Sequence, residues 1–163
     1  MEVALSEEQR RLYSKLYVSC TDIDFARYCA GVLLKKGWHG MPWERRGTIY
    51  QQQAAFTTSL VTAYARPFTR SHGWPKIPLE LIIYDHPEQE LHEHIIALRH
   101  KVYAHSDSES YSVRLWRSGS FATDIIGSPT LRLTAAEAAL FQVMTAKIMK
   151  SMRARMKAIL AAV

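Results

Sequence analysis

The sequence predicts an all-α protein, an antiparallel bundle of about four long helices with one small β-hairpin inserted at residues 111–126. Apolar residues recur at helical spacing over four long stretches of the chain. The regular alternation of strands and helices that builds a parallel sheet is missing from the pattern. The 163 residues, 48% of them apolar, are enough for one core, so we expect a single domain over 1–163.

The first helix is expected to begin after Ser6, because Ser6 and Gln9 have the spacing of a capping box. It is expected to end at Gly37, which follows two lysines in the last turn. Thr21 and Asp22 lie in the middle of this stretch and could restart or kink the helix.

The second helix is expected over residues 49–65. Arg66 should end it, because Pro67 disfavours helical geometry in the residue before it. A third helix is expected from Pro87 to Tyr103, since proline is tolerated in a first turn.

Residues 106–130 are rich in Ser, Gly and Asp and contain two short alternating runs. These runs predict the inserted hairpin. Thr134 and Glu137 then form another capping box, and the last helix should continue to the C-terminus.

The formal charge of +6 and the apolar fraction exclude a disordered chain. The longest uncharged stretch, 47–65, contains three Gln and four Thr, which argues against a bilayer span. The N-terminus shows no apolar run typical of a signal peptide. Cys20 and Cys29 fit reduced core residues, so we expect a cytoplasmic protein without membrane contact.

The end of the third helix combines residues suited to phosphate chemistry: Arg99, His100, Lys101, Tyr103 and His105. Arginine offers a fixed cationic fork for a phosphate, and histidine can exchange a proton near neutral pH. This set, without paired carboxylates, fits cleavage of RNA by its own 2′-hydroxyl, with no metal or cofactor. A basic last turn that complements the helix dipole is the alternative.

The string LRHKVYAHSD, residues 98–107, resembles the signature of the HEPN superfamily of prokaryotic helical domains. That signature is an Arg, usually a polar residue, and a His after four to six intervening positions, and Arg99, His100 and His105 match it. The segment AYARPFT, residues 63–69, resembles an upstream Tyr-x-Arg-x-Phe element of HEPN-like and abortive-infection-type proteins. The resemblance covers residues 54–110 well, the flanking helices loosely, and the hairpin not at all.

The resemblance implies a helical bundle that forms a homodimer through the helix carrying Arg99 and His105. Active members are metal-independent ribonucleases of toxin–antitoxin, abortive-infection and CRISPR-type systems, so an antitoxin or defence protein is an implied partner. Arg99 would stabilise the phosphate, His105 would transfer the proton or position the substrate, and His100 is the polar residue after the Arg, with Tyr103 nearby. Arg66 joins the cleft only by analogy with the second element. The alternatives are that it caps its helix or pairs with one of the acids between Glu80 and Glu93. Members silenced by nucleotidylation carry a Tyr where this chain has Asp107, so that regulation is not expected.

Basic residues of the last helix are a second candidate surface. Together with Lys101, we expect Lys150, Arg153 and Lys157 to attract the RNA backbone, since sequence-independent affinity comes largely from cations on phosphates. A solvated face and a membrane-surface helix are the alternatives.

Two other functions remain open at this point. One is a non-catalytic HEPN-like binding or dimerisation module. The other is a bundle that binds a metal or small ligand, because His86, Glu90 and Glu93 or His94 are spaced to share one helix face. We expect a solvated helix face there and no metal.

Overall fold

The computed structural model describes residues 5–41, 43–44, 47–70, 72–100, 112–127 and 132–162. Within these residues the chain is mostly helical, with four α-helices, two short 3₁₀ turns and one two-stranded antiparallel sheet. The prediction of a mostly helical chain with a small hairpin is therefore confirmed.

The first helix, α1 (Glu7–Lys36), has the ends that the sequence predicts. The Ser6 hydroxyl accepts from the Gln9 amide at 3.2 Å, and the Gln9 side chain accepts from the Ser6 amide at 3.0 Å. Gly37 closes the helix with φ of 62°, a left-handed conformation that glycine adopts without a Cβ penalty.

Thr21 and Asp22 do not interrupt α1, which is one helix of 30 residues. The Thr21 hydroxyl donates to the Tyr17 carbonyl at 3.3 Å, a bond within the helix that leaves the backbone ladder in place. Asp22 is engaged with another element, described below.

The second helix, α2 (Thr48–Ala65), ends as Pro67 predicts and continues into the 3₁₀ turn η1 (Arg66–Phe68). A second 3₁₀ turn, η2 (Leu79–Leu81), precedes the third helix.

The third helix, α3 (His86–Leu98), begins one residue before the predicted start. Asp85 and Glu88 form a capping box there. The regular helix ends at Leu98, and Arg99 and His100 form one wider, π-type turn. The predicted continuation to Tyr103 lies outside the described residues.

The hairpin consists of β1 (Ser112–Ser118) and β2 (Phe121–Gly127), within a residue of the predicted limits. The strands pair in full register, and Gly119 turns between them with φ of 58°. Among the described elements, the two strands contact only each other.

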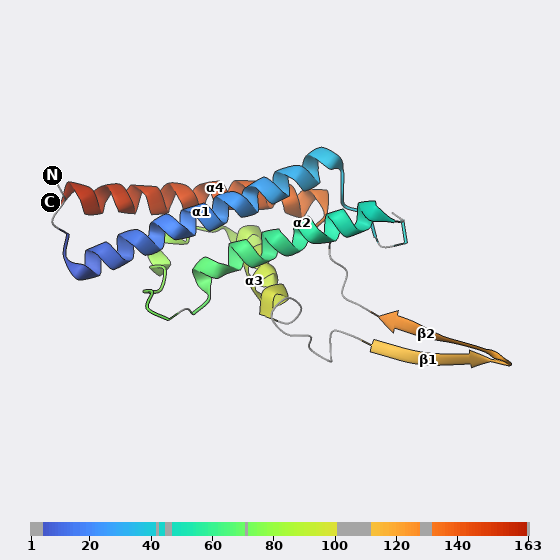
Figure 1. Ribbon diagram of the computed structural model, residues 1–163. Coiled ribbons are helices and arrows are strands. Elements are labelled where there is room, and N and C mark those ends of the chain that lie inside the picture. Colours follow the sequence, from blue (N-terminus) through green and yellow to red (C-terminus); the bar gives the residue numbers. More distant parts are fainter. Residues whose placement is uncertain are drawn as a thin grey trace.

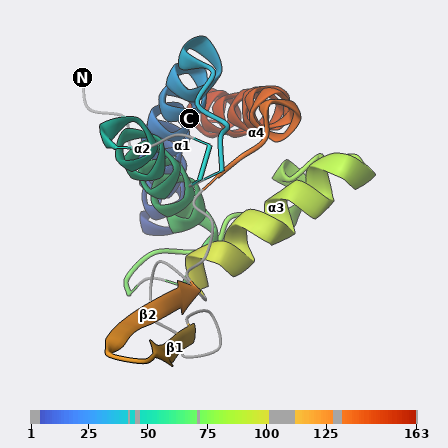
Figure 2. The ribbon, with the colours of Figure 1, turned by 90° about the vertical axis from the view of Figure 1, so that its right-hand side faces the viewer.

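The last helix, α4 (Ala135–Ala161), begins at the predicted Thr134–Glu137 capping box. Figure 1 shows α1 antiparallel to both α2 and α4, and α1 packs against each of them. The shorter α3 crosses the direction of these three helices (Figure 2) and contacts α2 and α4.

The core lies where α1, α2 and α4 meet, with α3 closing one side. Its largest fully buried side chains include Leu16, Ile23, Leu33, Leu60, Tyr64, Ile95, Phe141, Met144, Ile148 and Met152. In the part of the chain that is described, no helix has both the length and the apolar character of a bilayer span.

Candidate functional site

Arg99 lies at the end of α3, where the regular helix widens, and its side chain is half-buried. Its Nη1 is 3.3 Å from Nδ1 of the exposed His100. Among the described residues, no carboxylate forms an ion pair with Arg99. The guanidinium is therefore not neutralised by that part of the chain, and it remains suited to bind an anion.

Three residues of the predicted site, Lys101, Tyr103 and His105, lie outside the described residues. The structure therefore gives no distance between Arg99 and His105. The structure describes Arg99, His100 and Arg66 of the predicted catalytic and supporting set.

His92 lies on the same side of α3 as Arg99, two turns nearer the N-terminus, about 10 Å along the axis. Its Nδ1 is 2.8 Å from the Tyr64 hydroxyl of α2, which is also 2.9 Å from the Tyr84 hydroxyl. The imidazole meets the Phe68 ring edge-on, with centroids 4.8 Å apart. His92 thus joins the Tyr64–Phe68 element to the helix that carries Arg99.

Burial sets the protonation of this cluster. Burial lowers the pKa of His92, and nearby Glu93 opposes the shift. Burial also raises the pKa values of Tyr64 and Tyr84 well above the usual range. At neutral pH the cluster therefore contains two neutral phenols and a neutral imidazole. Because Nδ1 of His92 is hydrogen-bonded to the Tyr64 hydroxyl, Nε2 is the ring nitrogen of His92 that is left to exchange a proton with a ligand.

A pocket of about 420 Å³ opens beside His92. Two exposed cations, Arg70 and Lys76, line it together with Trp74, which is 41% exposed, and Phe68. The pocket thus combines positive charge, an aromatic surface and a neutral imidazole. Such a combination is suited to an anionic ligand with a planar group.

The sequence predictions gave no role to His92, Arg70, Trp74 or Lys76. For His92, its helical spacing from Arg99 was a usable signal in the sequence. The other three lie in an irregular segment between η1 and η2, where no periodicity indicates which side chains converge.

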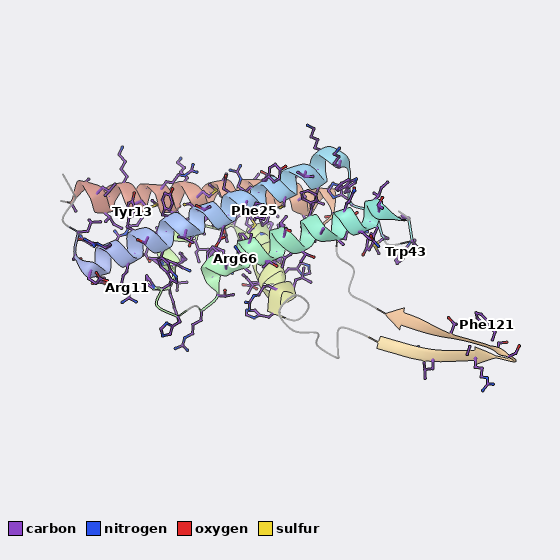
Figure 3. The ribbon with its side chains drawn as sticks, in the orientation of Figure 1. Arg11, Tyr13, Phe25, Trp43, Arg66 and Phe121 are labelled. Atoms are coloured by element: carbon purple, nitrogen blue, oxygen red, sulfur yellow. The ribbon has the colours of Figure 1, made fainter. Side chains whose placement is uncertain are left out.

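Arg66 has a partner on another helix. Its Nη1 lies 2.9 Å from Oδ1 of Asp22 on α1, and the two side chains are 62% and 19% exposed. The sequence alternative of a partner between Glu80 and Glu93 is wrong. Figure 3 shows Arg66 at the end of α2, facing α1.

The basic residues of α4 are exposed at Lys150, Arg153 and Lys157, whose spacing places them on one side of the helix. Lys147, one turn earlier, is engaged instead. Its ammonium lies 2.6 Å from the buried Glu88 carboxylate of α3, and this contact raises the lysine pKa. The cations at 150–157 are therefore the part of α4 that is exposed and forms no ion pair among the described residues.

The His-rich face of α3 does not gather into a metal site. His86 Nε2 lies 3.7 Å from Glu90 Oε1, and both side chains are largely exposed. The Glu93 carboxylate instead accepts a hydrogen bond from the side-chain amide of Gln89 at 2.6 Å. Over the described ranges, no group of three His, Cys, Asp or Glu side chains converges on a point that could hold a metal ion.

No family model matches the chain, and neither the curated proteins nor the solved structures include a match. In the structure, the segment 63–69 contacts α3 through Tyr64, Phe68 and His92.

Proposed function

We propose that this chain is a HEPN-like, metal-independent endoribonuclease that acts as a homodimer with a shared Arg/His cleft. The observation that supports this most is the position of Arg99. Its guanidinium has no carboxylate partner among the described residues, and helical spacing places it on the same side of α3 as His92, which lines the cationic pocket. A guanidinium without an acidic partner favours an anion such as a phosphate diester.

The chemistry would use the substrate's own nucleophile. The RNA 2′-hydroxyl loses its proton to an imidazole and attacks the adjacent phosphorus, while the 5′-oxygen leaves and takes up a proton. The products are a 2′,3′-cyclic phosphate and a 5′-hydroxyl end. Arg99 would stabilise the charge that builds on the phosphate, and His105 would transfer the proton, with His100 and Tyr103 as the supporting residues of this proposal.

The remaining parts of this function follow the same resemblance. A helical bundle would dimerise through the segment 99–105, so that two copies of Arg99 and His105 line one cleft. Lys150, Arg153 and Lys157, with Lys101, would hold the RNA backbone. A cytoplasmic toxin or abortive-infection role, with an antitoxin or defence partner, is the setting we propose.

A non-catalytic HEPN-like module is the second candidate, and one contact favours it. Tyr64 holds Nδ1 of His92 among the rings of Phe68 and Tyr84, an arrangement that also serves simple packing of α3 on α2. In that case the Arg99 surface binds RNA or a partner without cleaving it.

The test incubates the full-length protein with single-stranded RNA in EDTA and separates the products. We expect cyclic-phosphate ends, no cleavage of DNA of the same sequence, and a loss of roughly 100-fold or more in Arg99→Ala and His105→Ala. Arg114→Ala, which removes an exposed arginine from the hairpin, is the matched control and should cleave normally.

The outcomes separate the candidates. Cleavage that survives both Arg99→Ala and His105→Ala, or that EDTA abolishes, contradicts the mechanism. RNA binding that depends on Arg99, with no cleavage by the wild-type protein, supports the non-catalytic module instead.

A further inference from the structure

Helix α1 has an apolar face that lies outside the core. Val18, Phe25 and Tyr28 are 46%, 51% and 64% exposed, although each is an apolar or aromatic side chain. At about 3.6 residues per turn they lie on the far side of α1 from Leu16 and Ile23, which are fully buried. The described elements that α1 contacts are α2, α4 and η1, and they leave these three side chains exposed. An exposed apolar face of this kind indicates a contact with another surface.

The residues of this face repeat at alternating intervals of three and four positions. They are Val18, Thr21, Phe25, Tyr28 and Val32, and we call this set the outer seam of α1. A repeat of three and four is the spacing with which two helices pack along a common line. Helix α1 therefore has two apolar faces, one packed inside the bundle and one suited to a further helix outside it.

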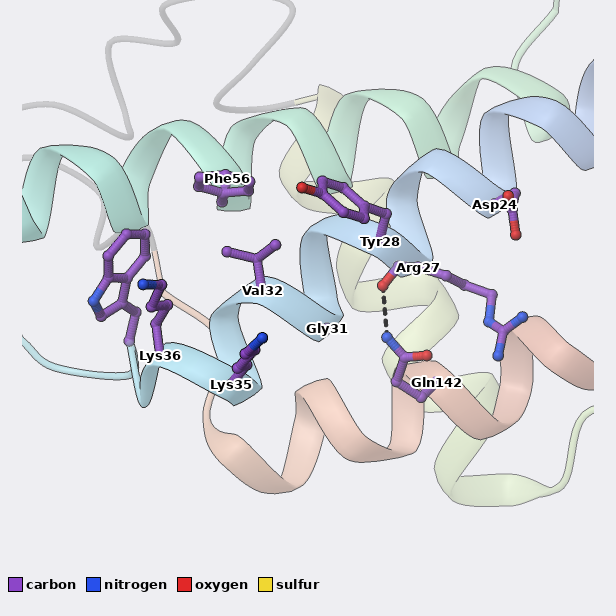
Figure 4. Close-up of a pocket in the computed structure, with 10 residues that line it drawn as sticks. Asp24, Arg27, Tyr28, Gly31, Val32, Lys35, Lys36, Phe56 and Gln142 are labelled. Carbon is purple, nitrogen blue, oxygen red and sulfur yellow. Dashed lines mark hydrogen bonds between the residues drawn. The ribbon is translucent and has the colours of Figure 1, made fainter.

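The C-terminal part of the outer seam is concave. A pocket of about 780 Å³ lies over it, lined by Tyr28 and Val32 of the seam and by Phe56 of α2. Figure 4 shows these side chains along the pocket, with Lys35 and Lys36 at the end of α1. This end of the seam thus combines an apolar hollow with two cations, and it suits a segment that is partly apolar and carries acids.

The two ends of α1 carry opposite charges. Glu7 and Glu8 lie in its first turn, and Lys35 and Lys36 lie in its last turn. All four side chains are exposed, and none forms an ion pair among the described residues. The ends of this 30-residue helix lie roughly 40 Å apart, so the opposite charges cannot meet within one copy of the chain. They can meet if a second α1 lies antiparallel to the first.

The charged ends are also in line with the outer seam. Glu7 precedes Val18, and Lys36 follows Phe25, by the same number of positions, which corresponds to about three helical turns. When Glu7 of one copy faces Lys36 of another antiparallel copy, Glu8 faces Lys35. In the same register Val18 of each copy faces Phe25 of the other, so the apolar and the charged contacts form together.

No like charges meet in this register. Every other charged residue of α1 falls opposite an uncharged one: Arg10 with Leu33, Arg11 with Val32, Lys15 with Tyr28, Asp22 with Thr21, Asp24 with Ser19 and Arg27 with Leu16. The dipoles of the two helices are antiparallel as well. The face is therefore complementary to itself, as an interface across a two-fold axis requires.

We propose that the outer seam of α1 docks onto the same seam of a second copy of this chain, antiparallel about a two-fold axis. This interface is separate from the dimer interface proposed above at the segment 99–105, and it shares no residue with it. A chain with two different two-fold interfaces assembles beyond a dimer, into a closed tetramer or a longer chain of copies. An unrelated partner protein would need no match between the two ends of α1.

Sedimentation velocity of the full-length protein over a range of concentrations tests the seam. We expect the wild-type protein to self-associate, and Phe25→Glu to weaken this association roughly tenfold or more, because it places a charge at an apolar contact on both copies. Ile83→Glu is the matched control, since Ile83 is 64% exposed and lies outside α1. It should associate as the wild-type protein does, and melting temperatures will show that each variant folds.

A charge swap tests whether the partner is a second copy. Glu7→Lys/Glu8→Lys and Lys35→Glu/Lys36→Glu should each weaken the association roughly tenfold, because like charges then face each other at both ends of the pair. All four substitutions in one chain bring opposite charges together again and should restore the association. The helix dipole disfavours the swapped charges at both ends of α1, so a more stable helix cannot explain the recovery.

Three results would overturn the proposal. They are a wild-type mass that Phe25→Glu does not lower, a fourfold charge-swap variant that associates no better than the two double variants, and an Ile83→Glu variant that dissociates as much as Phe25→Glu. The first result would leave the outer seam to a different partner protein. A dimer through the segment 99–105 can persist in Phe25→Glu, so the readout is the drop in mass. A wild-type protein that does not cleave RNA contradicts the proposed function without affecting this result.

Discussion

The Tyr64 hydroxyl lies 2.8 Å from Nδ1 of His92. This one hydrogen bond ties α2 to α3, and the same hydroxyl also reaches the Tyr84 hydroxyl at 2.9 Å. Tyr64 is fully buried, so its hydroxyl makes both contacts away from bulk water. The network adds to the buried packing of Leu91 and Ile95 and to the Lys147–Glu88 ion pair, which also hold α3 in place.

Tyr64→Phe should lower the free energy of unfolding by about 1–3 kcal/mol, because it leaves polar groups of His92 and Tyr84 without their partner. Urea denaturation measures this change. Tyr28→Phe, which removes an exposed hydroxyl, should change the free energy of unfolding by less than about 0.5 kcal/mol. Equal effects of the two substitutions would contradict a stabilising role for the buried network.

His92 should make the protein less stable in mild acid. Burial lowers its pKa in the folded state, so between that pKa and the ordinary value of about 6.5 the unfolded chain binds a proton that the folded chain does not. The free energy of unfolding therefore rises with pH across this window, and the contribution from His92 is lost as the pH falls. Urea denaturation measures the free energy of unfolding at pH 5 and at pH 7.5. The difference between these two free energies should be smaller in His92→Gln than in the wild-type protein.

His94→Gln is the matched control for this pH effect, because His94 is exposed on the same helix. It should retain the pH dependence of the wild-type protein. If His94→Gln reduces the slope as much as His92→Gln does, the buried imidazole is not its source.

The ion pair between Arg66 and Asp22 should contribute little to stability. Its Nη1 to Oδ1 distance is 2.9 Å, but Arg66 is 62% exposed, so water and salt screen the attraction. A double-mutant cycle with Arg66→Gln and Asp22→Asn should give a coupling energy of about 0.2–1 kcal/mol. A coupling well above this range would mean that the pair is a main attachment of α2 to α1.

The exposed stripe of α4 predicts a salt dependence of RNA binding. Replacing Lys150, Arg153 and Lys157 with Ala should lower the slope of log affinity against log salt by about 2, since each phosphate contact on a single strand contributes roughly 0.7. Fluorescence anisotropy at several salt concentrations measures the slope. Arg155→Ala removes one exposed charge from another side of the same helix and should leave the slope nearly unchanged.

Helix ends were predictable from the sequence where the signal is local. Ser6 with Gln9 and Thr134 with Glu137 form capping boxes in the structure, and Gly37 ends α1. These contacts join residues three positions apart, so no tertiary information is needed to recognise them. Asp85 and Glu88 have the same spacing, and that signal was present in the sequence but was not used.

The candidate site was only partly predictable, because its contacts join residues far apart in the chain. Arg99 and His92 follow from helical spacing, but the hydrogen bond from Tyr64 depends on how α2 and α3 pack. The alternative partners considered for Arg66, between Glu80 and Glu93, are on the wrong elements for the same reason, since Asp22 is 44 positions away. Periodicity describes which side of a helix is apolar and not which helix faces it.

The hairpin offers a practical position for labelling the protein. Among the described elements its strands contact only each other, and Ser120 at its turn is exposed. A fluorophore or affinity tag attached at Ser120 would disturb neither the helical core nor the pocket beside His92, whose lining residues all come from other segments.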